Sequence, residues 1–309
     1  MSALTAAWAW LAAPWQFEFM QRALLVTTVA AVVCALLSCW LVLIGWSLLG
    51  DAVSHAVLPG VVLAYLVGWP FAVGALVFGV GAVGLIGAVR DTTRVKEDAA
   101  IGVVFTTLFA LGVVLVSVTP SQIDLSHILF GNVLGVPDAD VVQVVVLGAL
   151  TGVVLVAKRR DLTLLAFDPT HAHAVGLSPR RLEVLLLGLL ALTVVVALQA
   201  VGVVLVVAML ITPGATALLL CERMGPMLVV APLLAAGCAV AGLYASFFLD
   251  TSSAGTVVVA QGAAFAAAYV LAPRRGVLAA RRRRRRALAS PPVPAAPVTA
   301  PGPAPTPTA

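Results

Sequence analysis

The sequence predicts an all-α, polytopic helical membrane protein, and its composition carries most of that prediction. Of the 309 residues, 62% are hydrophobic and only 10% are charged, whereas soluble domains are about half apolar and about a quarter charged. The mean hydropathy is +1.12. Long apolar runs without alternation of period two favour helices over a β-barrel.

Nine apolar runs approach the length of about 20 residues that a helix needs to cross a bilayer. The second is short and contains Pro59 and Gly60, so we expect it to be broken or partly re-entrant, and eight or nine spans in total. The Pro-Gly pair either kinks the helix or frees backbone carbonyls that could face an ion. The runs cover residues 22–44, 52–68, 71–89, 99–118, 138–157, 182–199, 201–220, 226–248 and 254–272.

The two ends of the chain differ from this central region. Residues 1–17 form a segment before the first span, residues 18–273 the transmembrane domain, and residues 274–309 a tail. The tail combines six consecutive arginines with a Pro/Ala-rich stretch, and we expect it to be disordered. Such a basic run beside a membrane is typical of contact with anionic lipid rather than with nucleic acid.

Basic residues gather in alternate loops and set the expected orientation. With nine spans, these loops and the tail all lie on one side, and only Arg22 lies opposite. The positive-inside rule makes the basic side cytoplasmic, with the N-terminus outside and the C-terminus inside, and it favours nine spans over eight. The basic loop residues are Arg90, Arg94, Lys96, Lys158, Arg159, Arg160, Arg180, Arg181 and Arg223.

Asp51 and His55 lie inside the second apolar run, in the segment GDAVSHAVLPG. At a spacing of four they share one face of a helix. A charged Asp at membrane depth costs roughly 2.5–3.5 kcal/mol, so it should line a cavity or meet a partner. A carboxylate and an imidazole suit a divalent transition metal. Asp51 and His55 are therefore candidate metal ligands; the alternative is a polar pair that helps two helices pack.

The segment from Lys158 to Glu183 is too long and too patterned for a simple connector. Asp168 suits a helix N-cap, Pro169 the first helical position and Gly176 the helix end. We expect a short helix at the cytoplasmic face, where it could dock on a motor subunit; the alternative is a surface helix without a partner. His171 and His173, two positions apart, point in different directions and suit a shared metal poorly.

The sequence carries no motif for ATP binding or catalysis. Lys96 and Lys158 are the two lysines, and neither belongs to a Walker A sequence. We therefore expect no enzyme activity, and an ATPase on a separate chain if transport is ATP-driven. Asp124 and His127, three positions apart in the outer loop, could lie at the mouth of a pathway, although a satisfied loop histidine is an equal alternative.

Four segments resemble, in order and spacing, the permeases of the ABC-3 family, the membrane subunits of bacterial zinc, manganese and iron importers. They are GDAVSHAVLPGVVLAYLVG, KEDAAIGVVFTTLFALGVVL, FDPTHAHAVGL and VGVVLVVAMLITPGATALLL. The resemblance covers about Phe17 to Pro273. It implies a fold like that of type II ABC importers, in the bacterial plasma membrane. It also implies a homodimer, cytoplasmic ATP-binding subunits and an external metal-binding lipoprotein.

The resemblance also implies roles for individual residues. Asp51 and His55 match the pair thought to contact metal in such importers, and Phe167, Asp168 and Gly176 match the element that couples to the ATPase. Pro213 and Gly214 match the family's Thr/Ile-Pro-Ala-Ala segment, with Gly in place of the first Ala. That change permits a closer backbone approach or more flexibility.

The identity of the transported metal is a finer question. The segment DLSHILFGNVLGV is more similar to the manganese and iron members than to the zinc members, and the chain has only four histidines. We therefore expect Mn²⁺ as cargo, with zinc or iron as alternatives, and no permanently bound cofactor. A permease for a siderophore or cobalamin-type complex would need a wider pathway and no Asp-His pair. A stand-alone secondary transporter would usually have inverted repeats, which the sequence does not show convincingly.

Overall fold

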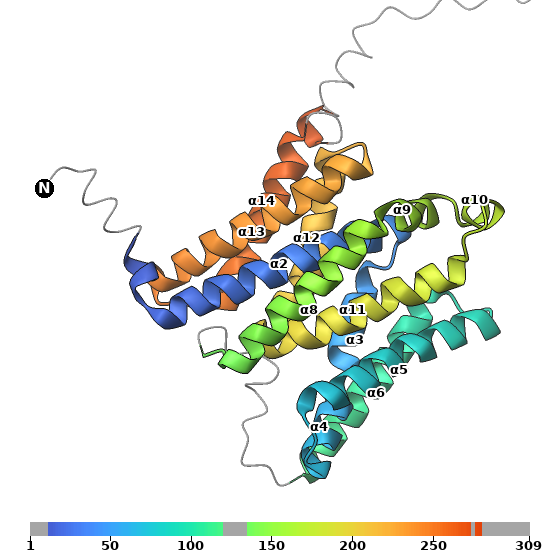
Figure 1. The fold of residues 1–309 in the computed structure, drawn as a ribbon, viewed down its shortest axis with the longest axis horizontal. Coiled ribbons are helices and arrows are strands. Elements are labelled where there is room, and N and C mark those ends of the chain that lie inside the picture. Colours follow the sequence, from blue (N-terminus) through green and yellow to red (C-terminus); the bar gives the residue numbers. More distant parts are fainter. Residues whose placement is uncertain (1–11, 120–134, 273–275, 280–309) are drawn as a thin grey trace, which may run out of the picture.

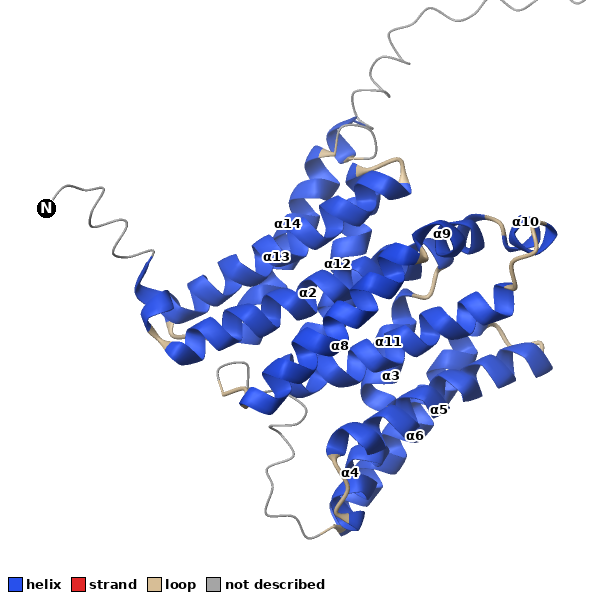
Figure 2. Ribbon diagram, in the orientation of Figure 1, coloured by secondary structure: helices blue, strands red, loops and turns tan. Residues whose placement is uncertain are grey.

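The computed structural model describes residues 12–119, 135–272 and 276–279, and within these ranges all regular structure is helical (Figures 1 and 2). Nine spans in this part of the chain are long and apolar enough to cross a membrane. This confirms the predicted fold class and the larger of the two predicted span counts. The helices are η1 (Ala13–Gln16), α2 (Glu18–Ile44), α3 (Ser47–Ala56), α4 (Leu58–Val67), α5 (Phe71–Thr92), α6 (Glu97–Val118), α8 (Asp138–Ala157), α9 (Arg159–Phe167), α10 (Pro169–Ala174), α11 (Pro179–Val201), α12 (Val203–Leu220), α13 (Met224–Leu249) and α14 (Ser253–Leu271).

Helix α2 is the centre of the bundle. It is buried along most of its length and packs against α8, α11, α12 and α13. In Figure 1, α2 runs between α13 and α8. The approach of α12 is close enough that a Cβ at Gly214 would overlap the side chain of Ser38 on α2. Of the two possibilities drawn from the sequence for Gly214, the structure therefore has the close backbone approach.

The second span is broken, as predicted, into α3 and α4, which meet at Val57. Pro59 lies in the first turn of α4, where it has no N–H to donate to the preceding turn of helix. Figure 1 shows α4 beside α5 and α6 at the edge of the molecule, and α3 nearer its centre. The break therefore separates a helix that carries Asp51 and His55 from one that serves packing.

Close packing of two helices explains why residue 60 is a glycine. It is buried in α4, and a Cβ at this position would overlap the carbonyl oxygen of Gly74 on α5. A Cβ at Gly74 would in turn overlap the carbonyl oxygen of Gly60. The close approach explains the glycine at position 60, while the suggestion that carbonyls freed by the Pro-Gly pair face an ion stays a prediction.

Because each span reverses direction, the basic loop residues lie at one end of the bundle, which we call the basic end; Arg90, Lys158, Arg181 and Arg223 mark it. At the opposite end, Arg22 of α2 pairs with Asp138 at the start of α8, at 2.8 Å. The arrangement agrees with the predicted segregation of charge, while the side of the membrane that each end faces stays a prediction. The arginine run of the tail lies outside the described residues, and the predicted domain boundaries stay predictions.

The close contact of α4 with α5 can be tested by adding one methyl group. Gly60→Ala should lower the melting temperature of the detergent-solubilised protein, because the new Cβ forces two backbones apart at a cost of about 1–3 kcal/mol. Gly81→Ala on α5 is the matched control, since a Cβ there meets nothing within 4 Å. Equal melting temperatures for the two variants would contradict the contact.

Candidate metal site and coupling element

Asp51 and His55 lie one turn apart on α3 and contact each other. The distance from Asp51 Oδ1 to His55 Nε2 is 3.5 Å, and the side chains are 37% and 25% exposed, respectively. The residues between them, Ala52 to Ser54, are buried against the rest of the bundle. On the remaining side of α3, Asp51 is partly open to solvent, whereas His55 is largely covered by α6.

The imidazole of His55 is packed against two aromatic rings of α6. Its centroid lies 5.4 Å from that of Phe105 and 5.3 Å from that of Phe109, the second contact being edge-on. The rings of Phe105 and Phe109 also stack on each other. These contacts restrict the orientation of the imidazole. Neither phenylalanine was predicted as part of the site; their one signal in the sequence is the spacing of four within an apolar span.

The two nitrogens of His55 have different surroundings. Nε2 lies toward Asp51, whereas Nδ1 is buried and has no hydrogen-bond partner among the described residues. The His55 side chain lines a small pocket together with Leu58, Phe109, Leu198 and Val203. In a neutral imidazole one nitrogen carries the proton and the other has the free lone pair. Nε2, beside the carboxylate, is thus the nitrogen placed to bind a cation.

The pair supplies two protein ligands, fewer than a complete coordination shell. In the part of the chain that the structure describes, no group of three or more His, Cys, Asp or Glu side chains lies together. The donor set, one carboxylate and one imidazole, suits borderline divalent metals. Further ligands would have to be water, backbone carbonyls or groups from another chain, which the exposed position of the pair allows.

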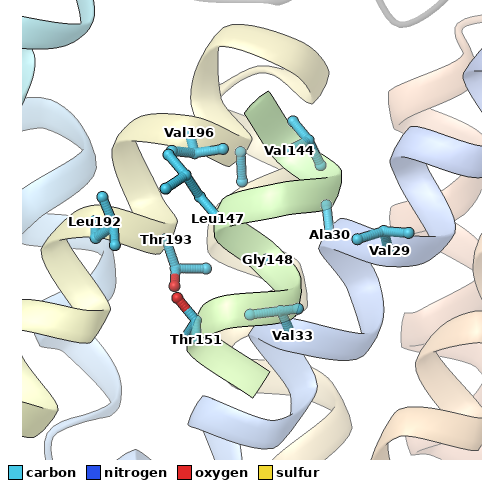
Figure 3. A pocket seen from close by; sticks show the side chains of 11 residues that line it. Val29, Ala30, Val33, Val144, Leu147, Gly148, Thr151, Leu192, Thr193 and Val196 are labelled. Atoms are coloured by element: carbon cyan, nitrogen blue, oxygen red, sulfur yellow. The ribbon is translucent and has the colours of Figure 1, made fainter. Parts of the chain in front are cut away.

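A second pocket lies between α2, α8 and α11 (Figure 3). Its walls are apolar except for Thr151 and Thr193, whose hydroxyl groups point toward each other in Figure 3 and have no partner among the described residues. It contains no carboxylate, imidazole or thiol. This pocket therefore lacks the chemistry of a transition-metal site.

Pro213 and Gly214 lie inside α12, away from solvent. The N–H of Gly214 donates to Ser38 Oγ at 3.1 Å, and that hydroxyl donates to the carbonyl of Ile211 at 3.3 Å. A small pocket beside Pro213 contains Gln261 of α14, which is 2% exposed and whose amide has no partner in the described structure. Gln261 was not predicted as a functional residue, although an amide side chain within an apolar span is a signal of one.

Helix α12 also reaches the neighbourhood of the candidate metal ligands. A Cβ at Gly50, next to Asp51, would come within 2.8 Å of the side chain of Leu210. The backbone of α3 therefore lies directly on α12 beside the pair. The structure places Pro213 on the same helix as this contact, three positions after Leu210.

The predicted short helix is α10, and its ends are as expected from the sequence. Asp168 caps it, accepting a hydrogen bond from the N–H of His171 at 2.8 Å, and Pro169 begins it. Gly176, just after its end, has φ +86°. Phe167, before the cap, is 66% exposed. We call residues 167–176 the corner: a capped short helix at the basic end, with an exposed aromatic side chain before the cap.

Helix α9, which precedes this corner, was not predicted. It buries Leu162 and Leu165, and its Thr163 accepts a hydrogen bond from Trp40 Nε1 of α2 at 3.4 Å. Figure 1 shows α9 between the end of α8 and α10. The corner is therefore anchored to the central helix of the bundle. Asp124 and His127 lie outside the described residues.

Comparison with known proteins relates the chain to a single group. The ABC 3 transport family matches residues 16–272. Over 272 residues, 88% of this chain and 89% of the relative, it is 49% identical to the manganese transport system membrane protein MntB of Synechocystis sp.. It is 44% identical to the chelated iron transport system membrane protein YfeC of Yersinia pestis, covering 91% and 95% of the two chains.

One solved structure has the same fold along most of its length. It is described as PsaBC from Streptococcus pneumoniae in complex with Fab. The TM-score is 0.80 at 35% identity, with 88% of this chain and 98% of that chain covered. The agreement extends the likeness from sequence to the arrangement of the spans.

The cap of α10 gives a test of the corner. Asp168→Ala should speed amide hydrogen exchange in residues 170–174 about fivefold, because losing an N-cap costs about 1 kcal/mol. Asp168→Asn retains a capping oxygen and should exchange like the wild type. The geometry described for Asp168 would be wrong if the alanine variant exchanged no faster than the asparagine variant.

Proposed function

The chain belongs to the ABC 3 transport family, and we propose that it is the membrane-spanning permease of an ATP-driven importer for a divalent transition metal ion. In this proposal the protein is a multi-pass component of the bacterial plasma membrane that does not itself hydrolyse ATP. A cytoplasmic ATP-binding subunit supplies the energy, and an extracytoplasmic metal-binding lipoprotein delivers the ion. The basic end faces the cytoplasm, in accord with the positive-inside rule.

The observation that carries the proposal is the Asp51–His55 pair. A carboxylate and an imidazole converge on a partly exposed part of a membrane-spanning helix, with Nε2 toward Oδ1 at 3.5 Å. Intramembrane ionisable side chains usually mark an ion pathway. A carboxylate serving only to pack two helices would be expected to lie between them, covered. Asp51 instead remains 37% exposed, which supports the role of metal contact over the packing alternative.

We propose Mn²⁺ as the transported ion, with iron next and zinc as a further alternative. Relatives with 49% and 44% identity are named for manganese and for chelated iron. Carboxylate and imidazole donors suit these borderline cations, and the pair includes no thiolate that would favour softer ones. A siderophore or cobalamin-type complex is a weaker candidate, because a large organic ligand has no need for a carboxylate-imidazole pair.

Two protein ligands suit an ion that must be released again. Conduction requires binding strong enough for entry and weak enough for exit. A second copy of the chain, with its own α3 facing the first, would form the other wall of the pathway and complete a homodimer. ATP binding and hydrolysis in the partner subunits would then shift the dimer between outward-open and inward-open states.

The proposal can be tested by transport in vesicles that contain this chain, its ATPase and its metal-binding protein. We expect ATP-dependent import of Mn²⁺ in preference to Fe²⁺ and Zn²⁺. Asp51→Asn and His55→Gln should each lower import at least about tenfold, since each removes one of two ligands while preserving side-chain size.

The matched control is Glu18→Gln, which removes an exposed carboxylate that pairs with Arg22 within its own helix. It should transport like the wild type. Import at the wild-type rate in Asp51→Asn would refute the assignment of the pair. Import of no free ion, but of a metal chelate, would move the substrate to the complexed class.

A further inference from the structure

Three side chains from different helices meet at the basic end. Arg90, in the last turn of α5, donates to Glu183 of α11 at 3.3 Å. Its guanidinium also lies over the ring of Trp46, 5.8 Å from the centroid. The Arg90 and Glu183 side chains are only 31% and 28% exposed, and Trp46 is 4% exposed. Partial burial limits solvent screening of the ion pair and strengthens the contact with the aromatic ring.

Trp46 lies at the start of α3, the helix that carries Asp51 and His55. It is the N-cap of α3 and lies five positions before Asp51, about 7.5 Å along a helix axis. Gly45, immediately before it, has φ +94°, and a Cβ there would meet nothing within 4 Å. The α2–α3 turn is therefore conformationally permissive at Gly45, and the buried Trp46 ring fixes the start of α3.

Glu183 lies on α11, the helix that follows the corner. Helix α11 begins at Pro179, five positions after α10 ends. Between them the N–H groups of Gly176 and Leu177 donate to the carbonyls of His173 and Ala172, both at 3.0 Å. This short, hydrogen-bonded connection makes a displacement of α10 act on the start of α11.

The other end of α11 reaches the candidate metal site. Leu198 and His55 line the same small pocket. The helix is continuous from Pro179 to Val201 and mostly buried. A tilt of α11 would thus be felt at both ends of α3: at Trp46 through Glu183 and Arg90, and at His55 through Leu198.

We propose that Glu183, Arg90 and Trp46 form a link that transmits displacement of α10 to α3, and so couples the ATPase cycle to the positions of Asp51 and His55. The inference rests on the proposed function and adds to it the residues that carry the coupling. None of the three touches the metal; they are positioning residues. The link holds the start of α3 against α5 and α11, so that the three helices move together between the two access states.

The test uses the assembled complex with ATPase and binding protein in vesicles. Glu183→Gln removes the charge and keeps the shape. It should lower Mn²⁺ import per ATP hydrolysed on the order of fivefold or more, the usual span of a coupling between sites. Basal ATP hydrolysis and the half-saturating concentration of metal-loaded binding protein should not change. The double charge reversal Arg90→Glu/Glu183→Arg should restore only the part of the import that depends on the ion pair, because the cation over the Trp46 ring is lost.

The control is Asp161→Asn, which breaks the Lys158–Asp161 pair, 3.1 Å long, at the same end of the bundle. It should leave import per ATP unchanged. If Glu183→Gln imports Mn²⁺ at the wild-type rate and with the wild-type amount of import per ATP hydrolysed, the link is refuted and the proposed function is not. Equal losses of basal ATP hydrolysis and import reduce these residues to a structural role and also overturn it. A wild-type complex that imports no metal overturns the proposed function, and the link with it.

Discussion

The free-energy cost of holding a carboxylate at membrane depth is the constraint on which the arrangement of α3, α4 and α6 depends. That cost reaches roughly 2.5–3.5 kcal/mol at the centre of a span, and for Asp51 it is offset by a neighbouring imidazole and by partial exposure of the carboxylate. Phe105 and Phe109 hold the imidazole by ring contacts, so the pair keeps its geometry without a network of polar partners. A cation between the two side chains would further compensate the charge.

Backbone contacts of glycine keep the surrounding helices in place. Gly60 lies against Gly74 where α4 crosses α5, and Gly214 lies against Ser38 where α12 crosses α2. In a bilayer, lipid tails are as apolar as the helices, so close approach rather than hydrophobic burial drives helix association. The break before Pro59 allows α4 to form its own contact while α3 lies on α12. Asp51 and His55 thus lie on a short helix that packs on α12 and ends at the break before α4.

Hydropathy and capping rules predicted much of this structure, because both are local. The nine spans follow from run length, the break from Pro59, and the ends of α10 from Asp168 and Gly176. Helix α9 was missed because its basic opening, Lys158 to Arg160, is typical of a loop. The aromatic contacts of His55 and the pairing of Arg90 with Glu183 join separate helices. Apolar spans have little periodicity to mark the inward face, so no local pattern predicts such contacts.

The central claim is that Asp51 and His55 bind a transition metal ion in the membrane domain. Pulsed electron paramagnetic resonance of Mn²⁺ bound to the purified chain tests it directly, because electron spin-echo modulation reports imidazole nitrogen in the coordination shell. We expect nitrogen modulation in the wild type, its loss in His55→Gln, and its retention in His171→Gln at the basic end. Nitrogen modulation that persists unchanged in His55→Gln would contradict the account.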